Sequence, residues 1–212
     1  MVDNSPLDRT RGAILGAILA GGAATRLGDA ARGGDKCLIE IGGASLLTYV
    51  VARLRPQVAT LLLNANGDAA RFETYGLDVA GDAEPGQGPL GGVIAALGEA
   101  RRRGFAFCLT VPGDAPLLPL DLAARLHSAI GDDAPCAVAT SAGQRQSVFA
   151  LWRSSALGDL QQIYDGGTRA LWRAQEKLGA VAVPFETAAA FQGLNRPEDR
   201  TALATALTRA KA

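Results

Sequence analysis

Short apolar runs, separated by segments of helical periodicity, recur along the whole sequence. Residues 13–20 and 105–111 are apolar without polar alternation, which is the pattern of strands buried on both faces of a sheet. Residues 45–55 and 90–103 instead carry their apolar side chains at helical spacing. This alternation predicts an α/β fold with three layers, in which helices cover both faces of a mostly parallel, twisted sheet.

The same patterns predict the remaining elements. We expect strands at residues 58–63, 77–80, 136–140, 147–152 and 181–185, and helices at residues 68–75, 119–130, 168–178 and 197–211. A turn at Ala142-Gly143 separates the strands at 136–140 and 147–152. No internal repeat or long linker divides the chain, so we expect a flexible leader at residues 1–12 and a single domain at residues 13–212.

Charge and hydropathy exclude several classes of partner. Lys plus Arg and Asp plus Glu both total 21, so no net basic field attracts nucleic acid or an anionic membrane. Arg9 and Arg11 precede an apolar run and loosely imitate a secretory signal, but Asp3 and Asp8 dilute the charge and Gly16 interrupts the run. A membrane span needs about 18 apolar residues, and no stretch reaches that length.

Cysteine, histidine and tryptophan offer no obvious chemistry. The three cysteines are an odd number without a Cys-x-x-Cys pair, so we expect buried or partly buried thiols in a reducing, cytoplasmic compartment rather than disulfides or a zinc site. The single histidine, His127, is interpreted as a surface or boundary residue because no Ser/His/Asp set accompanies it. Trp152 and Trp172 are interpreted as core or flanking aromatics.

A glycine-rich loop follows the first predicted strand, where ligands bind in open parallel sheets. Residues 19–28 read Leu-Ala-Gly-Gly-Ala-Ala-Thr-Arg-Leu-Gly, and a second glycine pair precedes Lys36. Glycine pairs let backbone N–H groups approach phosphate oxygens, and Arg26 and Lys36 would add positive charge. The loop is neither a P-loop nor a dinucleotide fingerprint. A tight exit from the strand would explain the glycines alone, but the two cations favour phosphate.

Two polar segments follow later strands. Asn64 opens Asn-Ala-Asn-Gly-Asp, which on composition alone favours an Asx turn and helix cap. Asp82 precedes a glycine-rich segment at residues 86–92 that opens a helix, whose free N–H groups would face the same edge of the sheet. Gly91 and Gly92 would allow a ligand to approach closely. The Asp82 carboxylate could accept from the two N–H groups on the pairing edge of guanine, although a solvated loop charge is the alternative.

The last two segments contain Asp114 and Asn195. Asp114 lies between Pro112 and Pro116, directly after a buried strand, which suits a Mg²⁺ ligand better than a simple turn acid. Asn195-Arg196-Pro197 is typical of a helix start, and capping explains it without a function.

With these five segments in this order, residues 13–205 resemble the molybdenum cofactor guanylyltransferases, which belong to the nucleotide-diphospho-sugar transferase-like fold family. The resemblance implies a Rossmann-like nucleotidyltransferase fold. It also implies Mg²⁺-dependent transfer of GMP from GTP to the terminal phosphate of molybdenum-bound molybdopterin, with release of pyrophosphate. Contacts with molybdopterin-synthesising proteins and with molybdoenzyme chaperones are expected on the same basis.

The resemblance also assigns roles to residues that match the family motifs. The nucleotide-binding residues it implies are Leu19, Ala20, Gly21, Lys36, Asn64, Asp82 and Asp114. Lys36, Arg26 and Asp114 are the implied catalytic residues, and Asp114 is also the implied metal ligand.

Three departures from the family pattern concern the phosphate loop and the acceptor side. The loop before Lys36 is a few residues longer, the family's Asn-x-Asn-x-Pro reads Gly193-Leu194-Asn195-Arg196-Pro197, and Arg145-Gln146-Ser147 lacks the usual proline. The alternatives are a CTP-dependent molybdopterin or sugar-phosphate nucleotidyltransferase of the same fold, and a non-catalytic nucleotide-binding or cofactor-binding module. The presence of Lys36 and Asp114 argues against the last of these.

Overall fold

The computed structural model describes residues 13–21 and 35–211. The predicted leader at residues 1–12, Arg26, and most of the long loop before Lys36 therefore lie outside the described residues.

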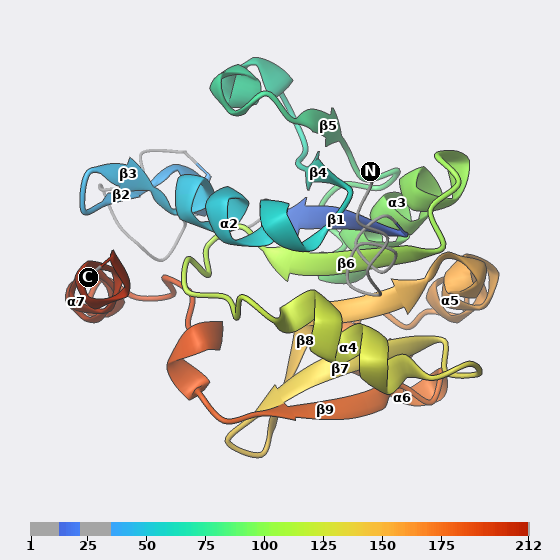
Figure 1. Ribbon diagram of the computed structural model, residues 1–212. Helices are drawn as coiled ribbons and strands as arrows, with labels where there is room; N and C mark the ends of the chain where they lie inside the picture. The colour runs from blue at the N-terminus through green and yellow to red at the C-terminus, as the bar shows by residue number, and fades with distance from the viewer. Residues whose placement is uncertain (1–12, 22–34, 212) are drawn as a thin grey trace, which may run out of the picture.

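One mixed sheet organises the molecule (Figure 1). Its strand order is β5-β4-β1-β6-β8-β7-β9. The strands are β1 (Ile14–Leu19), β4 (Thr60–Asn64), β5 (Asp78–Ala80), β6 (Phe107–Pro112), β7 (Cys136–Ser141), β8 (Gln144–Arg153) and β9 (Val181–Phe185). Every neighbouring pair is parallel except the two that β8 makes, with β6 and β7. The predicted mostly parallel sheet is thus confirmed, and the carboxyl ends of β1, β4 and β6 share one edge.

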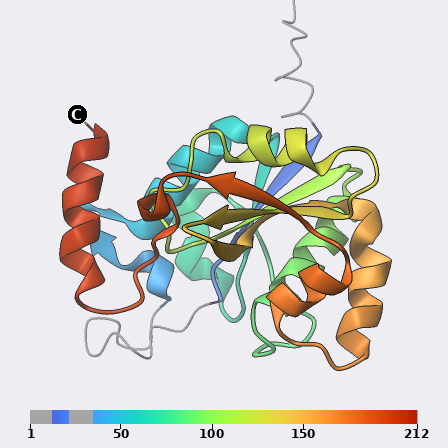
Figure 2. The same cartoon turned by 90° about the horizontal axis from the view of Figure 1, so that it is seen from below.

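Helices lie against the two faces of this sheet (Figure 2). They are α2 (Leu46–Leu54), α3 (Pro89–Arg102), α4 (Leu122–Ile130), α5 (Leu157–Asp165) and α6 (Leu171–Lys177), whereas α7 (Asp199–Lys211) lies apart from them. The 3-10 helices are η2 (Lys36–Leu38), η3 (Arg55–Gln57), η4 (Ala69–Tyr75), η5 (Ser154–Ala156) and η6 (Ala188–Phe191). A small hairpin of β2 (Glu40–Ile41) and β3 (Ala44–Ser45) precedes α2.

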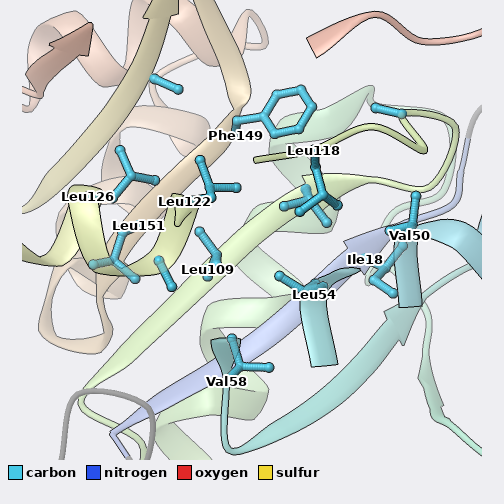
Figure 3. Packing of buried hydrophobic residues seen from close by; sticks show 14 of the residues in the cluster. Ile18, Val50, Leu54, Val58, Leu109, Leu118, Leu122, Leu126, Phe149 and Leu151 are labelled. Carbon is cyan, nitrogen blue, oxygen red and sulfur yellow. The ribbon is translucent and has the colours of Figure 1, made fainter. Parts of the chain in front are cut away.

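Two apolar clusters explain why the buried strands lack alternation. Ile18 of β1 packs with α2 and α4 residues such as Val50 and Leu122 on one face (Figure 3). Leu15 of the same strand packs with α3 and with Trp152 on the other face. Because both faces of β1 are covered, the side chains that point to either face must be apolar. The predicted three-layer architecture is therefore confirmed.

A third, smaller cluster holds α7 beside the β2–β3 hairpin, apart from the two helical layers (Figure 1). Leu203 and Leu207 of α7 pack with Ile41, Leu46 and Leu194. This packing brings the segment before α7 back across the carboxyl edge of the sheet.

Several predicted boundaries were wrong. Helix α5 was not predicted, because few of its residues are apolar and buried. The buried ones, Leu160 and Tyr164, form one narrow stripe along the helix. The predicted helices at residues 119, 168 and 197 begin two or three residues later, at Leu122, Leu171 and Asp199. Strand β8 begins at residue 144 rather than 147, through an irregularity in its register with β7.

The residues without assigned chemistry mostly behave as predicted. All three cysteines are free and buried, and burial raises the pKa of Cys37 and of Cys136 to about 12. His127 is partly buried and packs edge-on to Phe107, with ring centroids 5.0 Å apart. Trp152 is fully buried, whereas Trp172 is 45% exposed on α6 and lies outside the core. None of the described helices combines the length and apolar character needed to cross a membrane.

Candidate nucleotide-binding site

A cavity of about 510 Å³ opens at the carboxyl ends of β1, β4 and β6. Its lining includes every nucleotide-binding residue that the resemblance implies: Leu19, Ala20, Gly21, Lys36, Asn64, Asp82 and Asp114. These residues come from four of the five segments described above, and the topology of the sheet brings them together because parallel strands end at one edge.

Lys36 and Asp114 form an ion pair in this cavity. Lys36 Nζ donates to Asp114 Oδ2 over 2.7 Å, and the two side chains are 19% and 17% exposed. Lys36 begins η2, whose next residue, Cys37, is buried and anchors the segment. Lys36 and Asp114, which lie 78 residues apart in the sequence, therefore face one shared cavity.

Asn195 also belongs to this cluster. Its Oδ1 accepts a 2.9 Å hydrogen bond from Lys36 Nζ, although 159 residues separate the two in sequence. The interpretation of Asn195 as a helix cap was wrong, because Asp199 instead accepts from the backbone N–H groups of Asn195 and Arg196. The local sequence does not distinguish a helix cap from a partner of Lys36, because an Asn next to a helix start is compatible with both roles.

The backbone around Asp114 is held from the same C-terminal segment. The backbone N–H of Leu194 donates to the Asp114 carbonyl over 3.3 Å. A Cβ added at Gly193 would lie 3.1 Å from the carboxylate atoms of Asp114. At this position, where the family pattern has asparagine, glycine leaves space for the acid.

On the other side of the cavity, two asparagines hold Asp82. Asn64 Nδ2 donates to Asp82 Oδ1 over 2.8 Å, and Asn66 Nδ2 donates to Asp82 Oδ2 over 3.0 Å. Asn66 Oδ1 in turn accepts from the backbone N–H of Asp82 over 2.8 Å. Asp82 is thus an oriented carboxylate rather than a solvated loop charge.

These contacts add a role to the segment after β4, while Asp68 at its end provides the predicted turn and helix cap. Asn64 is 3% exposed, and the cap of η4 is Asp68, which accepts from the backbone N–H of Ala70. The sequence reasoning missed the role of Asn66. The Asn-x-Asn spacing was the available signal, because alternate residues leaving a strand can point the same way.

Gly92 lines the cavity and also has a structural role that was not predicted. A Cβ at this position would lie 2.4 Å from Asn64 Oδ1 and 3.5 Å from Asp82 Oδ1. The glycine therefore lets α3 approach the Asn64–Asp82 pair, in addition to lining the cavity.

The loop between Asp82 and α3 is tied to the α5 side of the molecule. Tyr164 Oη donates to Glu84 Oε2 over 2.9 Å, and Arg169 Nε donates to Gln87 Oε1 over 3.3 Å. The Arg169 guanidinium also stacks over the Tyr164 ring, 4.0 Å from its centroid. These tethers hold a loop whose glycines would otherwise allow many conformations.

Residues 16–179 match the family model described as the MobA-like NTP transferase domain. The chain belongs to this family. It is 41% identical over 186 residues to the molybdenum cofactor guanylyltransferase of Cereibacter sphaeroides, covering 88% of this chain and 93% of the relative. It is 49% identical over 149 residues to that of Rhodopseudomonas palustris strain BisB5, covering 68% of this chain and 69% of the relative. The predicted family resemblance is thereby confirmed.

A solved structure supports the fold assignment of this MobA-like chain. The crystal structure of molybdopterin-guanine dinucleotide biosynthesis protein A from Archaeoglobus fulgidus superposes with a TM-score of 0.68 at 20% identity. The likeness covers 92% of this chain and 99% of that protein. The predicted Rossmann-like nucleotidyltransferase fold is confirmed.

The donor set of this MobA-like site fits a magnesium ion. Within residues 13–21 and 35–211, no group of three or more His, Cys, Asp or Glu side chains is arranged to hold a metal. Mg²⁺ commonly uses only one or two carboxylates, with water and substrate phosphate oxygens completing its octahedron. Asp114, partly exposed and facing the cavity beside Lys36, supplies a carboxylate of that kind.

Proposed function

We propose that the protein transfers GMP from GTP to the terminal phosphate of molybdenum-bound molybdopterin. The product is the guanine dinucleotide form of the molybdenum cofactor, and pyrophosphate leaves. The observation that carries this proposal is the shared cavity: an ion-paired Lys36 and Asp114 at one side and an oriented Asp82 at the other. The guanylyltransferase relatives, which align over most of the chain, support the same activity.

The proposed chemistry is a direct in-line displacement without a covalent enzyme intermediate. An oxygen of the acceptor phosphate attacks the α-phosphorus of GTP, and the bond from that phosphorus to the bridging oxygen of the β-phosphate breaks. The acceptor is already an anion, so it needs little general-base assistance. The work of the protein is positioning and charge neutralisation.

Lys36 is the proposed neutralising residue among those described. Its ammonium lies between Asp114 and Asn195 and can donate to phosphate oxygens as negative charge builds on the leaving pyrophosphate. Arg26, implied by the resemblance to face the phosphates as well, lies outside the described residues. Mg²⁺, held by Asp114, would offset charge on the phosphates when bound.

Asp82 supports guanine as the base. Each of its oxygens already accepts from one asparagine amide, and a carboxylate retains further acceptor capacity. Guanine presents two N–H donors on its pairing edge, which match this acceptor. Cytosine presents one donor there, its 4-amino group, beside the N3 lone pair, which a carboxylate would repel. This difference favours GTP over CTP as the donor nucleotide.

The deciding experiment measures pyrophosphate release by the purified protein with Mg²⁺, molybdenum-loaded molybdopterin and either GTP or CTP. We expect release with GTP, its loss on addition of EDTA, and its recovery with excess Mg²⁺. Faster release with CTP would replace the guanylyl assignment, and a sugar phosphate that outcompetes molybdopterin would replace the acceptor. Nucleotide binding without release would support the non-catalytic module.

A glycine substitution tests the nucleoside side of the cavity. We expect Gly92→Ala to weaken GTP binding roughly tenfold or more, because its Cβ must displace the Asn64 side chain that holds Asp82. Isothermal titration calorimetry measures the affinity. Gly98→Ala is the matched control on the same helix, since a Cβ there meets no atom within 4 Å. Equal affinities of the two variants would contradict the proposed role of the Asn64–Asp82 pair.

We also propose a cytoplasmic location, with molybdopterin-synthesising proteins and molybdoenzyme chaperones as partners. The three free, buried cysteines suit a reducing compartment. Cell fractionation tests the location, and crosslinking in cells that make the cofactor tests the contacts.

A further inference from the structure

One arginine outside the predicted site connects its two sides. Arg71 lies on η4, and its guanidinium donates to three separate groups. Nε donates to the Asp35 carboxylate, Nη1 to the Asp68 carbonyl, and Nη2 to the Asn66 carbonyl over 2.6 Å. The side chain is 29% exposed and its Asp35 partner is 18% exposed.

Two of these groups adjoin residues of the proposed mechanism. Asp35 directly precedes Lys36 and is the N-cap residue of η2, the 3-10 helix that presents the ammonium to Asp114. Asn66 holds both a carboxylate oxygen and the backbone N–H of Asp82. The Arg71 guanidinium therefore links the segment that carries Lys36 to the segment that orients Asp82.

The arginine itself is well anchored. Its guanidinium carbon lies 4.5 Å from the ring centroid of Phe72, and Phe72 is fully buried. The planar guanidinium has five donors in a fixed fork, which allows bonds to several segments at once. A lysine could keep the charge but would present one compact ammonium in place of that fork.

We infer that Arg71 is a positioning residue that sets the placement of Lys36 and the orientation of Asp82 together. The inference rests on the proposed function, because it concerns how that site is held. It predicts two separable consequences of losing Arg71: slower transfer, through the Asp35–Lys36 segment, and poorer recognition of guanine, through Asn66 and Asp82.

Two variants separate these consequences. Arg71→Gln removes the guanidinium that donates all three hydrogen bonds. Asp35→Asn weakens only the bond between Arg71 and the segment that carries Lys36. The measurements are kcat by pyrophosphate release, and the Kd values of GTP and of inosine triphosphate, which lacks the 2-amino donor of guanine. We expect both variants to lower kcat, Arg71→Gln by roughly tenfold to a hundredfold. We expect Arg71→Gln alone to reduce the preference for GTP over inosine triphosphate, by roughly tenfold.

Arg71→Lys and Arg102→Gln complete the design. Arg71→Lys should restore little of the preference for GTP over inosine triphosphate. Lysine keeps the positive charge but lacks the several N–H donors of the planar guanidinium. Arg102→Gln removes an exposed arginine that pairs with Glu99 away from the cavity, and it should match the wild type. Thermal unfolding shows whether each variant is folded at the assay temperature. A loss of activity caused only by unfolding would leave the ratio of the two Kd values unchanged.

The outcomes distinguish this inference from the proposed function. A wild-type base preference in Arg71→Gln, or wild-type kcat in Asp35→Asn, overturns the role of Arg71 and leaves the activity intact. A wild type that binds GTP but releases no pyrophosphate overturns the proposed activity, while the Kd ratios still decide the role of Arg71. A wild type that binds no nucleotide overturns both.

Discussion

Asp114→Asn is expected to reduce kcat by at least about a thousandfold, equivalent to about 4 kcal/mol on the activation barrier. The substitution keeps the size of the side chain but removes the charge that the proposed mechanism needs to hold Mg²⁺ beside the phosphates. It also removes the anionic partner of Lys36. Steady-state pyrophosphate release at saturating GTP and Mg²⁺ gives the value.

The same variant is not expected to weaken the binding of GTP when no metal is present. In EDTA, the Asp114 carboxylate of the wild type faces the negative triphosphate without a metal between them, so its neutralisation should leave GTP affinity equal or higher. This pairing of lost turnover with retained binding separates a metal role from general damage to the cavity.

Asp121→Asn is a matched control. Asp121 is exposed, lies 3.7 Å from Arg125 at the start of α4, and is absent from the cavity lining. It should retain wild-type turnover. Near-wild-type turnover in Asp114→Asn would contradict the proposal that Asp114 holds Mg²⁺.

Lys36→Gln is expected to lower kcat by roughly a hundredfold to a thousandfold, the usual loss when one donor to developing charge is removed. The physical reason is that the ammonium neutralises the leaving pyrophosphate more in the transition state than in the bound substrate. The Kd of GTP should therefore rise by a smaller factor than kcat falls. Single-turnover kinetics and calorimetry supply the two quantities.

Lys36→Arg tests whether charge alone suffices. The guanidinium keeps the positive charge but is larger and planar, and Lys36 is enclosed by Asp114 and Asn195. We expect activity between those of Lys36→Gln and the wild type. Lys177→Gln, on the exposed side of α6, is the control for loss of one surface lysine. If Lys36→Gln weakened GTP binding as much as it slowed turnover, Lys36 would be a binding residue without a special role in the transition state.

Most of the sheet and part of the site could be predicted from local patterns. The apolar run at residues 13–20 was better explained as a strand covered on both faces than as a secretory signal, and Asp114 stood out because it follows a buried strand between two prolines. The helix boundaries were less accurate. Helix α5 was missed because its buried stripe is narrow, and the close approach of Gly92 to Asn64 was not predicted.

The sequence by itself determined the layers, the strand-end positions of the chemistry-bearing residues and the family, because periodicity and motif order are local properties of the chain. The tertiary structure alone decided which of those residues touch. Lys36 meets Asn195 because the cluster of Leu194, Leu203 and Leu207 returns the C-terminal segment to the sheet edge. Asn66 and Arg71 acquire their roles in the same way. Asn66 holds Asp82 across 16 residues and Arg71 binds Asp35 across 36, and contacts over such separations follow from packing rather than from any local pattern.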